Sequence, residues 1–242
     1  MNNVSVIIPV YNESFLITKV CLKLLQNLEN SKIVNNFEII LVENGSTDNS
    51  AILVDKLSQE NLKIISLHLP NPDYGKAIKI GINEAQYELL INFSADFVDI
   101  EFLHKSLLII NDYDIVIGSY NIDFSDQRSF VRRFGSNVFN SISSAILGAD
   151  VSGSHGFKLI KSDIAKKISK QCYMTKDIFD DEMIYRMIKK NYKIKKEPLI
   201  FTEIRKPRSG IITRGFRAFR LLIYLKLLII YENIFKREFI ES

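Results

Sequence analysis

The amino-acid sequence predicts an α/β fold with a mostly parallel sheet flanked by helices. Short apolar runs alternate over residues 1–120 with segments in which apolar residues recur every three or four positions. This alternation is typical of parallel strands joined by helices that cover both faces of a sheet. The runs are almost continuously apolar, as in strands buried on both sides. Several runs end in acidic or small polar residues, and ligands bind beyond the carboxyl ends of such strands.

The first 120 residues contain five predicted strands. The first strand is Val4 to Pro9, and the apolar stripe from Ile17 to Leu28 indicates the helix that follows it. Gly45 suits a tight turn, and Ser46, Thr47 or Asp48 can cap a helix there. The alternation continues as strand 37–42, helix to about 57, strand 62–67, helix 76–85, strand 89–93, helix 101–111 and strand 115–118.

The alternation weakens after residue 119. The pattern predicts a helix over 129–147, a strand over 156–160, a helix over 179–190 and an extended segment over 194–202. The tail carries an apolar run from Leu221 to Tyr231, which Lys226 interrupts and which is shorter than the roughly 20 residues that span a bilayer. The tail could lie in a membrane interface, pack on the domain or join two subunits. We expect one domain over 1–210 and a basic, apolar helical extension over 211–242.

Composition and charge restrict the partners. Cys21 and Cys172 do not suggest a disulfide framework, which favours a reducing compartment. The start of the sequence lacks signal-peptide features, so we expect a cytoplasmic protein. Residues 1–157 hold 11 Lys/Arg and 18 Asp/Glu (−7), whereas residues 158–242 hold 21 and 10 (+11), which together give the net charge of +4. The basic half favours an anionic partner, and no motif of stacking aromatics points to nucleic acid.

Asp96 is the leading candidate for chemistry. The strand 89–93 leads directly into Ser94-Ala95-Asp96, which places a carboxylate at the edge where α/β proteins bind ligands. The same carboxylate could instead cap the next helix. The stretch alone leaves both interpretations open.

Three separated segments resemble family 2 glycosyltransferases of the GT-A fold. They are residues 4–13 (VSVIIPVYNE), residues 38–48 (EIILVENGSTD) and the strand that ends at Ser94-Ala95-Asp96. Further pieces are similar to the polyprenyl-phosphate branch, which includes dolichol-phosphate mannose synthase and undecaprenyl-phosphate sugar transferases. These pieces are Gly118-Ser119, the segment 128–140, Asp150 before Gly156-Phe157-Lys158-Leu159, residues 179–183, and residues 197–200 leading to Arg205.

The resemblance implies an inverting enzyme that moves a sugar from a UDP- or GDP-linked donor to polyprenyl phosphate, usually with Mg²⁺ or Mn²⁺. Transfer to a sugar hydroxyl of a growing glycan and a catalytically silent nucleotide-sugar-binding protein stay open as alternatives. By the resemblance, the residues that contact the nucleotide sugar are Pro9, Tyr11, Glu13, Glu43, Gly45, Lys76, Ser94, Asp96 and Arg205. Glu43 also suits a helix-capping loop, Pro9-Val10-Tyr11 an ordinary turn, and Lys76 an exposed surface.

The metal-binding motif departs from the family. Relatives carry Asp-x-Asp where this chain has Ser94-Ala95-Asp96, and often Gln where it has Val98. Asp96 is therefore the expected ligand, with Ser94 and His155 as further candidates, because Mg²⁺ and Mn²⁺ prefer hard oxygen donors and need only one or two carboxylates beside substrate phosphates. Asp99 is expected to cap the next helix. With fewer carboxylates, the cations Lys76, Arg205 and Arg208 could stabilise the leaving group.

Acids and arginines mark the expected acceptor side. Asp180, Asp181 and Glu182 occupy positions where relatives place acids near the acceptor. Helical spacing separates neighbours by about 100°, so the three acids cannot all face one site. By the resemblance we expect Asp180 and Glu182 to face it, with Asp181 as the alternative base. The expected phosphate contacts are Arg128, Arg132, Arg133 and Arg208. Together with Arg214, Arg217 and Arg220 beside the apolar tail, these groups suit peripheral binding to the anionic inner face of the cell membrane, while packing on the domain or homo-oligomer formation stays open.

Overall fold

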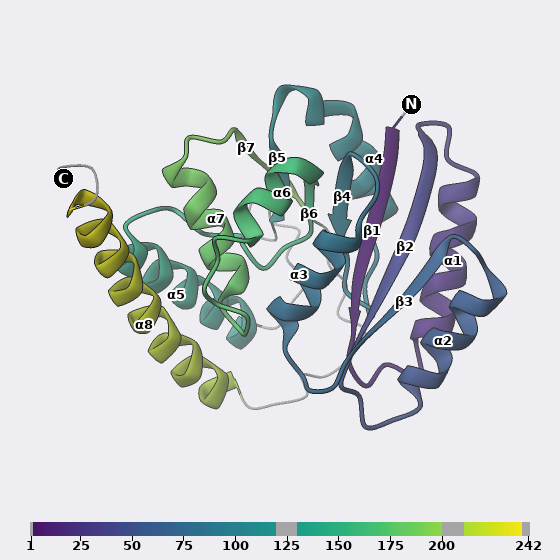
Figure 1. The fold of residues 1–242 in the computed structure, drawn as a ribbon, viewed down its shortest axis with the longest axis horizontal. Coiled ribbons are helices and arrows are strands. Elements are labelled where there is room, and N and C mark those ends of the chain that lie inside the picture. The colour runs from purple at the N-terminus through teal and green to yellow at the C-terminus, as the bar shows by residue number, and fades with distance from the viewer. Residues whose placement is uncertain (1, 120–129, 200–210, 239–242) are drawn as a thin grey trace.

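The computed structural model describes residues 2–119, 130–199 and 211–238, apart from the side chains at 130–132, 211–214 and 236–238. It shows seven strands in one sheet, in the order β3-β2-β1-β4-β6-β5-β7 (Figure 1). The strands are β1 Asn2–Val10, β2 Val34–Asn44, β3 Ile64–Leu69, β4 Leu89–Asn92, β5 Ile115–Ser119, β6 Lys158–Lys161 and β7 Ile194–Pro198. The helices are α1 Ile17–Glu29, α2 Ser50–Glu60, α3 Tyr74–Glu84, α4 Ile100–Ile109, α5 Phe130–Leu147, α6 Ser162–Ser169, α7 Phe179–Lys189 and α8 Ile211–Glu238, and a 3₁₀ turn spans Ile110–Asp112.

The sheet is mostly parallel, as the sequence predicts. β1 pairs in parallel with β2 on one side and β4 on the other, and β5 pairs in parallel with β7. β6 is the exception, because it runs antiparallel to both β4 and β5. The chain first builds outward from β1 through β2 to β3 and then returns to the other side of β1 with β4. This change of direction opens a crevice at the carboxyl ends of β1 and β4, where open α/β sheets bind ligands.

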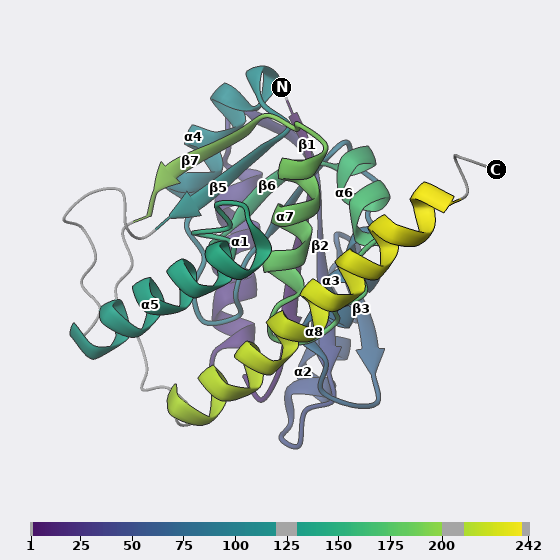
Figure 2. The ribbon, with the colours of Figure 1, turned by 90° about the vertical axis from the view of Figure 1, so that its left-hand side faces the viewer.

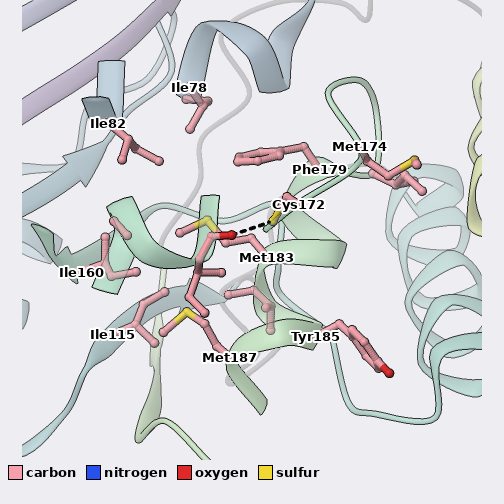
Figure 3. Close-up of a cluster of buried hydrophobic side chains, with 14 of the residues drawn as sticks. Ile78, Ile82, Ile115, Ile160, Cys172, Met174, Phe179, Met183, Tyr185 and Met187 are labelled. Atoms are coloured by element: carbon pink, nitrogen blue, oxygen red, sulfur yellow. Dashed lines mark hydrogen bonds between the residues drawn. The ribbon is translucent and has the colours of Figure 1, made fainter. Parts of the chain in front are cut away.

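Two hydrophobic cores cover the two faces of the sheet. Val4, Val6 and Ile8 point to the face under α1, α2 and α4, whereas Ile7 points to the face under α3, α6 and α7. Successive side chains of a strand alternate between faces, so a nearly continuous apolar strand feeds both cores. Figure 3 shows part of the second core, in which Phe179, Met183 and Met187 of α7 lie among side chains of α3 and the neighbouring strands.

The predicted elements agree with the structure over the described residues, with one omission. The sequence did not predict α6. This helix has eight residues, and its apolar side chains are Ile164, Ala165 and Ile168, all of them buried. Three apolar positions in so short a segment give too little periodicity to detect. The strand predicted over 156–160 begins later, at Lys158, because residues before it turn the chain past Gly118.

The C-terminal helix α8 packs along one side of the domain beside α5 (Figure 2). Ala218, Leu222, Leu225 and Ile229 recur every three or four residues and join the core that contains α7. Other apolar residues of α8 are exposed: Phe216, Phe219, Ile223, Tyr224, Leu227, Ile230, Tyr231, Ile234 and Phe235. No helix among the described residues is long and apolar enough to cross a membrane.

Gly156 allows the turn before β6 to approach β5 closely. A Cβ atom at this position would overlap the carbonyl oxygen of Gly118, at a separation well under the 3.0 Å that real Cβ atoms keep. The Gly118 N–H donates to the Phe157 carbonyl at 2.8 Å, which fixes the two backbones together. We expect Gly156→Ala to lower the free energy of unfolding by about 1–3 kcal/mol, the usual cost of overpacking.

Urea denaturation measures this loss. Gly215→Ala is the control, because a Cβ at exposed Gly215 of α8 meets no atom within 4 Å and alanine favours a helix. A Gly156→Ala variant as stable as the Gly215→Ala variant would contradict the expectation.

Candidate active site

A cleft of about 850 Å³ lies at the carboxyl ends of β1, β2 and β4. The lining residues come from the strand ends and the loops after them, from the turn before β6, from the segment before α7 and from α8. The cleft is lined by Pro9, Tyr11, Asn12, Glu13, Asn44, Pro72, Asp73, Tyr74, Asn92, Phe93, Ser94, Ala95, His155, Phe157, Lys176, Asp177 and Arg217. The predicted contacts Pro9, Tyr11, Glu13, Ser94 and His155 are therefore brought together in one place.

The loop after β1 is fixed to the turn after β2. The side-chain oxygen of Asn12 accepts from the Thr47 N–H at 2.7 Å, and the Asn12 N–H donates to Ser46 Oγ at 3.0 Å. Asn12 has a φ of 54°, a left-handed conformation that Asn tolerates better than most residues. These contacts hold Tyr11 and Glu13 at the mouth of the cleft.

Glu43 and Lys76 are predicted contacts that do not line the cleft, and the same holds for Gly45 and Asp96. Glu43 is buried, and its Oε1 accepts from the Ser46 N–H at 2.5 Å while its Oε2 lies 3.6 Å from His68 Nδ1. This arrangement supports the turn at Gly45, whose φ is 68°. Lys76 is exposed on α3. The neighbouring side chains Asp73 and Tyr74 line the cleft instead.

Asp96 follows β4 and accepts a hydrogen bond from Ser94 Oγ. Asp99, three residues later, accepts from the Phe102 N–H at 2.9 Å and caps α4, as the sequence predicts. Because Asp99 supplies the cap, Asp96 is not the residue that caps α4. Among the described residues, no group of three or more His, Cys, Asp and Glu side chains is arranged to hold a metal ion.

The paired oxygens of Ser94 and Asp96 nevertheless fit a hard divalent cation that takes its other ligands from substrate phosphates and water.

His155 lies between two acids of α7. Its Nε2 lies 3.1 Å from Asp181 Oδ2, and its Nδ1 lies 3.8 Å from Asp180 Oδ2. Asp181 also accepts from Ser154 Oγ at 3.0 Å. Because both ring nitrogens face carboxylates, this placement favours an ion pair over a metal ligand for His155.

Asp180 is held by two further groups. Its Oδ1 lies 3.0 Å from Nζ of Lys158, and its Oδ2 accepts from the Tyr74 hydroxyl at 3.0 Å. Lys158 also donates to the Gly156 carbonyl at 2.9 Å and, like Asp180, is almost completely buried. The sequence analysis did not select Lys158, although a lysine inside an apolar strand is a signal that it needs a buried partner.

Glu182 points away from the cleft. Its Oε1 accepts from the Tyr173 N–H at 2.9 Å and from Arg186 Nε at 2.8 Å, and its Oε2 accepts from the Met174 N–H at 2.7 Å. Arg186 continues to Glu232 of α8 at 3.3 Å. These contacts fix the segment before α7 and fasten α8. The acids that meet at His155 are Asp180 and Asp181, whereas Asp180 and Glu182 were predicted to face the site together.

Most of the predicted phosphate contacts lie outside the part of the chain that the structure describes. These are Arg128 and Arg208, together with the side chain of Arg132. The predicted nucleotide-sugar contact Arg205 also lies outside the described residues. Arg133 is exposed on α5. Arg217 of α8 instead reaches the cleft, beside Lys176 and Asp177.

The sequence of the chain matches one known protein family over most of its length. The model of glycosyl transferase family 2 matches residues 5–169. The chain belongs to glycosyl transferase family 2. The match runs from within β1 to the end of α6. This family-2 chain therefore carries Ser94 and Asp96 within the matched region.

Curated relatives of this family-2 chain are named as transferases that act on dolichyl or undecaprenyl phosphate. These names confirm the predicted resemblance to the polyprenyl-phosphate branch of the family. It is 28% identical over 222 residues to a dolichyl-phosphate beta-glucosyltransferase of Dictyostelium discoideum, covering 83% of this chain and 66% of the relative. It is 35% identical over 99 residues to an undecaprenyl-phosphate 4-deoxy-4-formamido-L-arabinose transferase of Proteus mirabilis, covering 40% of this chain and 29% of the relative.

Solved structures confirm the GT-A fold. Glucosyl-3-phosphoglycerate synthase of Mycobacterium tuberculosis in complex with UDP has a TM-score of 0.66 at 14% identity, covering 93% of this chain and 80% of that one. A mannosyltransferase of Pyrobaculum calidifontis in complex with GDP-Man and Mn²⁺ has a TM-score of 0.59 at 16% identity, covering 90% and 60%. Divalent metal thus accompanies the nucleotide sugar in at least one protein of this fold.

The ion pairs of His155 with Asp180 and Asp181 predict a pH-dependent contribution to stability. Desolvation of the ring opposes protonation, but the carboxylates of Asp181 and Asp180 outweigh it and raise the pKa of His155 above its ordinary value, while Lys158 opposes them. A group with a raised pKa in the folded state stabilises the fold below its unfolded pKa, about 6.5 for histidine. We therefore expect this stabilisation to be complete below pH 6.5 and to be lost as the pH rises through the folded-state pKa.

An NMR titration of the His155 ring tests this expectation. Asp181→Asn removes the nearest carboxylate and should bring the pKa of His155 down. An unchanged titration in that variant would show that the ion pair does not set the protonation of the ring.

Proposed function

We propose that this enzyme transfers a sugar from a UDP- or GDP-linked donor to a polyprenyl phosphate. The observation that carries the proposal is the cleft at the carboxyl ends of β1 and β4, with Ser94 in its lining and Asp96 hydrogen-bonded to Ser94, in a family-2 chain whose relatives are named for this reaction. The chain spans between 66% and 74% of the length of the dolichyl-phosphate relatives. The volume of the cleft, about 850 Å³, falls within the range of ligand pockets.

In this proposal the nucleotide part lies against the loop after β1. Pro9 and Tyr11 supply an apolar wall for the base, and Asn12, Asn44 and Asp73 supply polar atoms beside it. The turn contact between Asn12 and Thr47 keeps this wall in place without the ligand. A preformed wall lowers the ordering cost of binding.

Asp96 and Ser94 are proposed to hold Mg²⁺ or Mn²⁺. When bound there, the cation stabilises the negative charge that gathers on the departing nucleoside diphosphate. The two side chains are hydrogen-bonded to each other, so they are already close enough to act together. Lys176 adds positive charge to the lining of the cleft.

The acceptor phosphate is already an anion near neutral pH, so its oxygen can attack the anomeric carbon without an enzymic base. The new bond forms between that oxygen and the anomeric carbon as the bond from this carbon to the diphosphate oxygen breaks, which inverts the configuration in one displacement. Asp180, held by Lys158 and Tyr74, is then an ordered negative group near the cleft and not a base. Its proposed role is to orient Tyr74 and His155.

A sugar hydroxyl as acceptor would need a general base. The pair of His155 and Asp181 is the arrangement that would favour this second candidate, because His155 lines the cleft and Asp181 orients its ring. Polyprenyl phosphate as acceptor is consistent with the exposed apolar face of α8 beside the cleft and with peripheral attachment to an anionic membrane surface.

The test is transfer of labelled sugar from a panel of UDP- and GDP-sugars into organic-extractable lipid, with polyprenyl phosphate as acceptor and with Mn²⁺ or chelator. Label in the lipid fraction supports the proposal. Label only in water-soluble glycans would support the hydroxyl-acceptor alternative, and nucleotide-sugar binding without turnover across the panel would indicate a silent binding protein.

A further inference from the structure

Among the residues that the structure describes, two ionic contacts fasten α8 to the rest of the domain, and they differ in their surroundings. The first joins Glu182, Arg186 and Glu232, with side chains that are 0%, 8% and 18% exposed. The second joins Arg217 of α8 to Asp177, with side chains that are 59% and 32% exposed. Only the second lies in the lining of the cleft. The first contact is therefore structural, whereas the second is open to a ligand.

The contact between Arg217 and Asp177 has the geometry of phosphate recognition. Arg217 Nη2 donates to Asp177 Oδ1 at 2.9 Å, and Nε donates to Oδ2. Two parallel N–H groups of a guanidinium match the paired oxygens of a carboxylate or of a phosphate equally well. The Asp177 carboxylate thus occupies the position on Arg217 that a phosphate group of a substrate would take.

Exchange of these partners is energetically accessible. An ion pair between partly exposed side chains adds little net stability, because water solvates both charges when they separate. A phosphate monoester carries more negative charge than a carboxylate, so it competes well for the same guanidinium. Lys176 lies beside the pair in the cleft lining and adds a second cation.

The surroundings of Arg217 indicate which phosphate it meets. Phe216 is 70% exposed, and Phe219, Ile223 and Leu227 continue the exposed apolar side chains along α8. The buried stripe of Ala218, Leu222 and Leu225 holds the helix in place beneath them. A cation at the cleft with apolar side chains leading away from it is complementary to an amphiphile with a phosphate head and a hydrocarbon chain. A nucleotide diphosphate has no part that would use the apolar side chains.

We propose that Arg217 binds the phosphate of the lipid acceptor, taking it over from Asp177, and that the exposed apolar side chains of α8 accompany the first isoprene units. This inference rests on the proposed function and adds the residue that positions the acceptor. Asp177 keeps Arg217 ordered at the cleft before the acceptor arrives.

The test compares Arg217→Gln with Arg220→Gln, a matched control one helical turn away that is exposed but does not line the cleft. We expect Arg217→Gln to raise the KM for polyprenyl phosphate about 10- to 100-fold, the value of a charge-assisted contact, and to leave the KM for the nucleotide sugar unchanged. With the acceptor presented in neutral detergent, so that no anionic membrane takes part, Arg220→Gln should leave both KM values within about twofold of the wild type, since surface changes have small effects. Asp177→Asn should leave the acceptor KM unchanged or lower it, because it removes the competitor for Arg217.

Titration with farnesyl phosphate and farnesol gives a readout that does not depend on turnover. The wild type should bind farnesyl phosphate more tightly than farnesol, and Arg217→Gln should abolish most of that difference. If the wild type transfers sugar to lipid but the two arginine variants behave alike, this inference fails and the proposed function stands. If Asp177→Asn weakens acceptor binding as much as Arg217→Gln, the ion pair only fastens α8, and the inference also fails.

A raised KM for the nucleotide sugar in Arg217→Gln would assign the arginine to the diphosphate and overturn the inference. Thermal unfolding checks that each variant is folded, and Arg217→Lys, which keeps the charge but loses the paired N–H groups, should raise the acceptor KM by a smaller factor. A wild type that transfers no sugar but prefers farnesyl phosphate through Arg217 would refute the proposed reaction alone.

Discussion

Asp96→Asn is expected to lower kcat for sugar transfer by on the order of 100-fold or more, which is the scale of removing one group that stabilises developing charge. Asp96 follows β4, and its carboxylate accepts a hydrogen bond from Ser94 Oγ. Asparagine keeps the shape of the side chain but supplies no negative charge for a divalent cation. The measurement is initial-rate transfer from the nucleotide sugar over a series of Mn²⁺ concentrations.

Asp99→Asn is the matched control for this variant. It is the same substitution three residues later, and asparagine caps helices as well as aspartate does, so α4 and the activity should both be retained. Ser94→Asp tests the same site in the opposite direction, because a second carboxylate should lower the Mn²⁺ concentration needed for half-maximal activity. Wild-type rates in Asp96→Asn at all metal concentrations would show that Asp96 has no role in the reaction.

Lys158→Met is expected to lower the free energy of unfolding by about 3–5 kcal/mol, the cost of leaving a buried charge without its partner. The Nζ of Lys158 lies 3.0 Å from Asp180 Oδ1, and the two side chains are 4% and 3% exposed. Methionine preserves most of the volume of the lysine stem, so the loss reports the missing charge and not a cavity. Urea denaturation at neutral pH measures the effect.

Lys161→Met provides the control on the same strand. Lys161 pairs with Asp114 at 3.1 Å, but the two side chains are 36% and 23% exposed, so removal of this lysine should cost less than about 1 kcal/mol. Adding Asp180→Asn to Lys158→Met removes the unpaired carboxylate and should restore part of the stability. Equal stability of the two lysine variants would show that the buried pair does not stabilise the fold.

The proposed function explains why the site combines a reduced set of carboxylates with nearby cations. Ser94 in place of an acid leaves Asp96 as the carboxylate of the motif, while Lys176 brings positive charge to the lining of the cleft. Fixed cations and a metal ion act on the same developing charge. The relative weight of the two is what the Mn²⁺ series with Asp96→Asn measures.

The sequence by itself determined the order of strands and helices and the place of the leading acid. Alternating apolar patterns record which faces of a strand or helix are buried, so β1 to β5 and α1 to α4 were predictable from local spacing. The cap at Asp99 was predictable because it depends on residues three positions apart. Recognition of the segments around Glu13, Asp48 and Asp96 as family motifs then supplied the GT-A fold.

Only the tertiary structure decided the partners of the charged side chains. Asp181 meets His155, Asp180 meets Lys158, and Asp177 meets Arg217 because α7 and the segment before it pack between β6 and α8. Glu182 was predicted to face the site, yet packing turns it toward Arg186, which also pairs with Glu232. Helical spacing gives the angle between neighbours on α7 but not which neighbour faces the cleft, since that depends on how the helix is rotated against elements distant in the sequence.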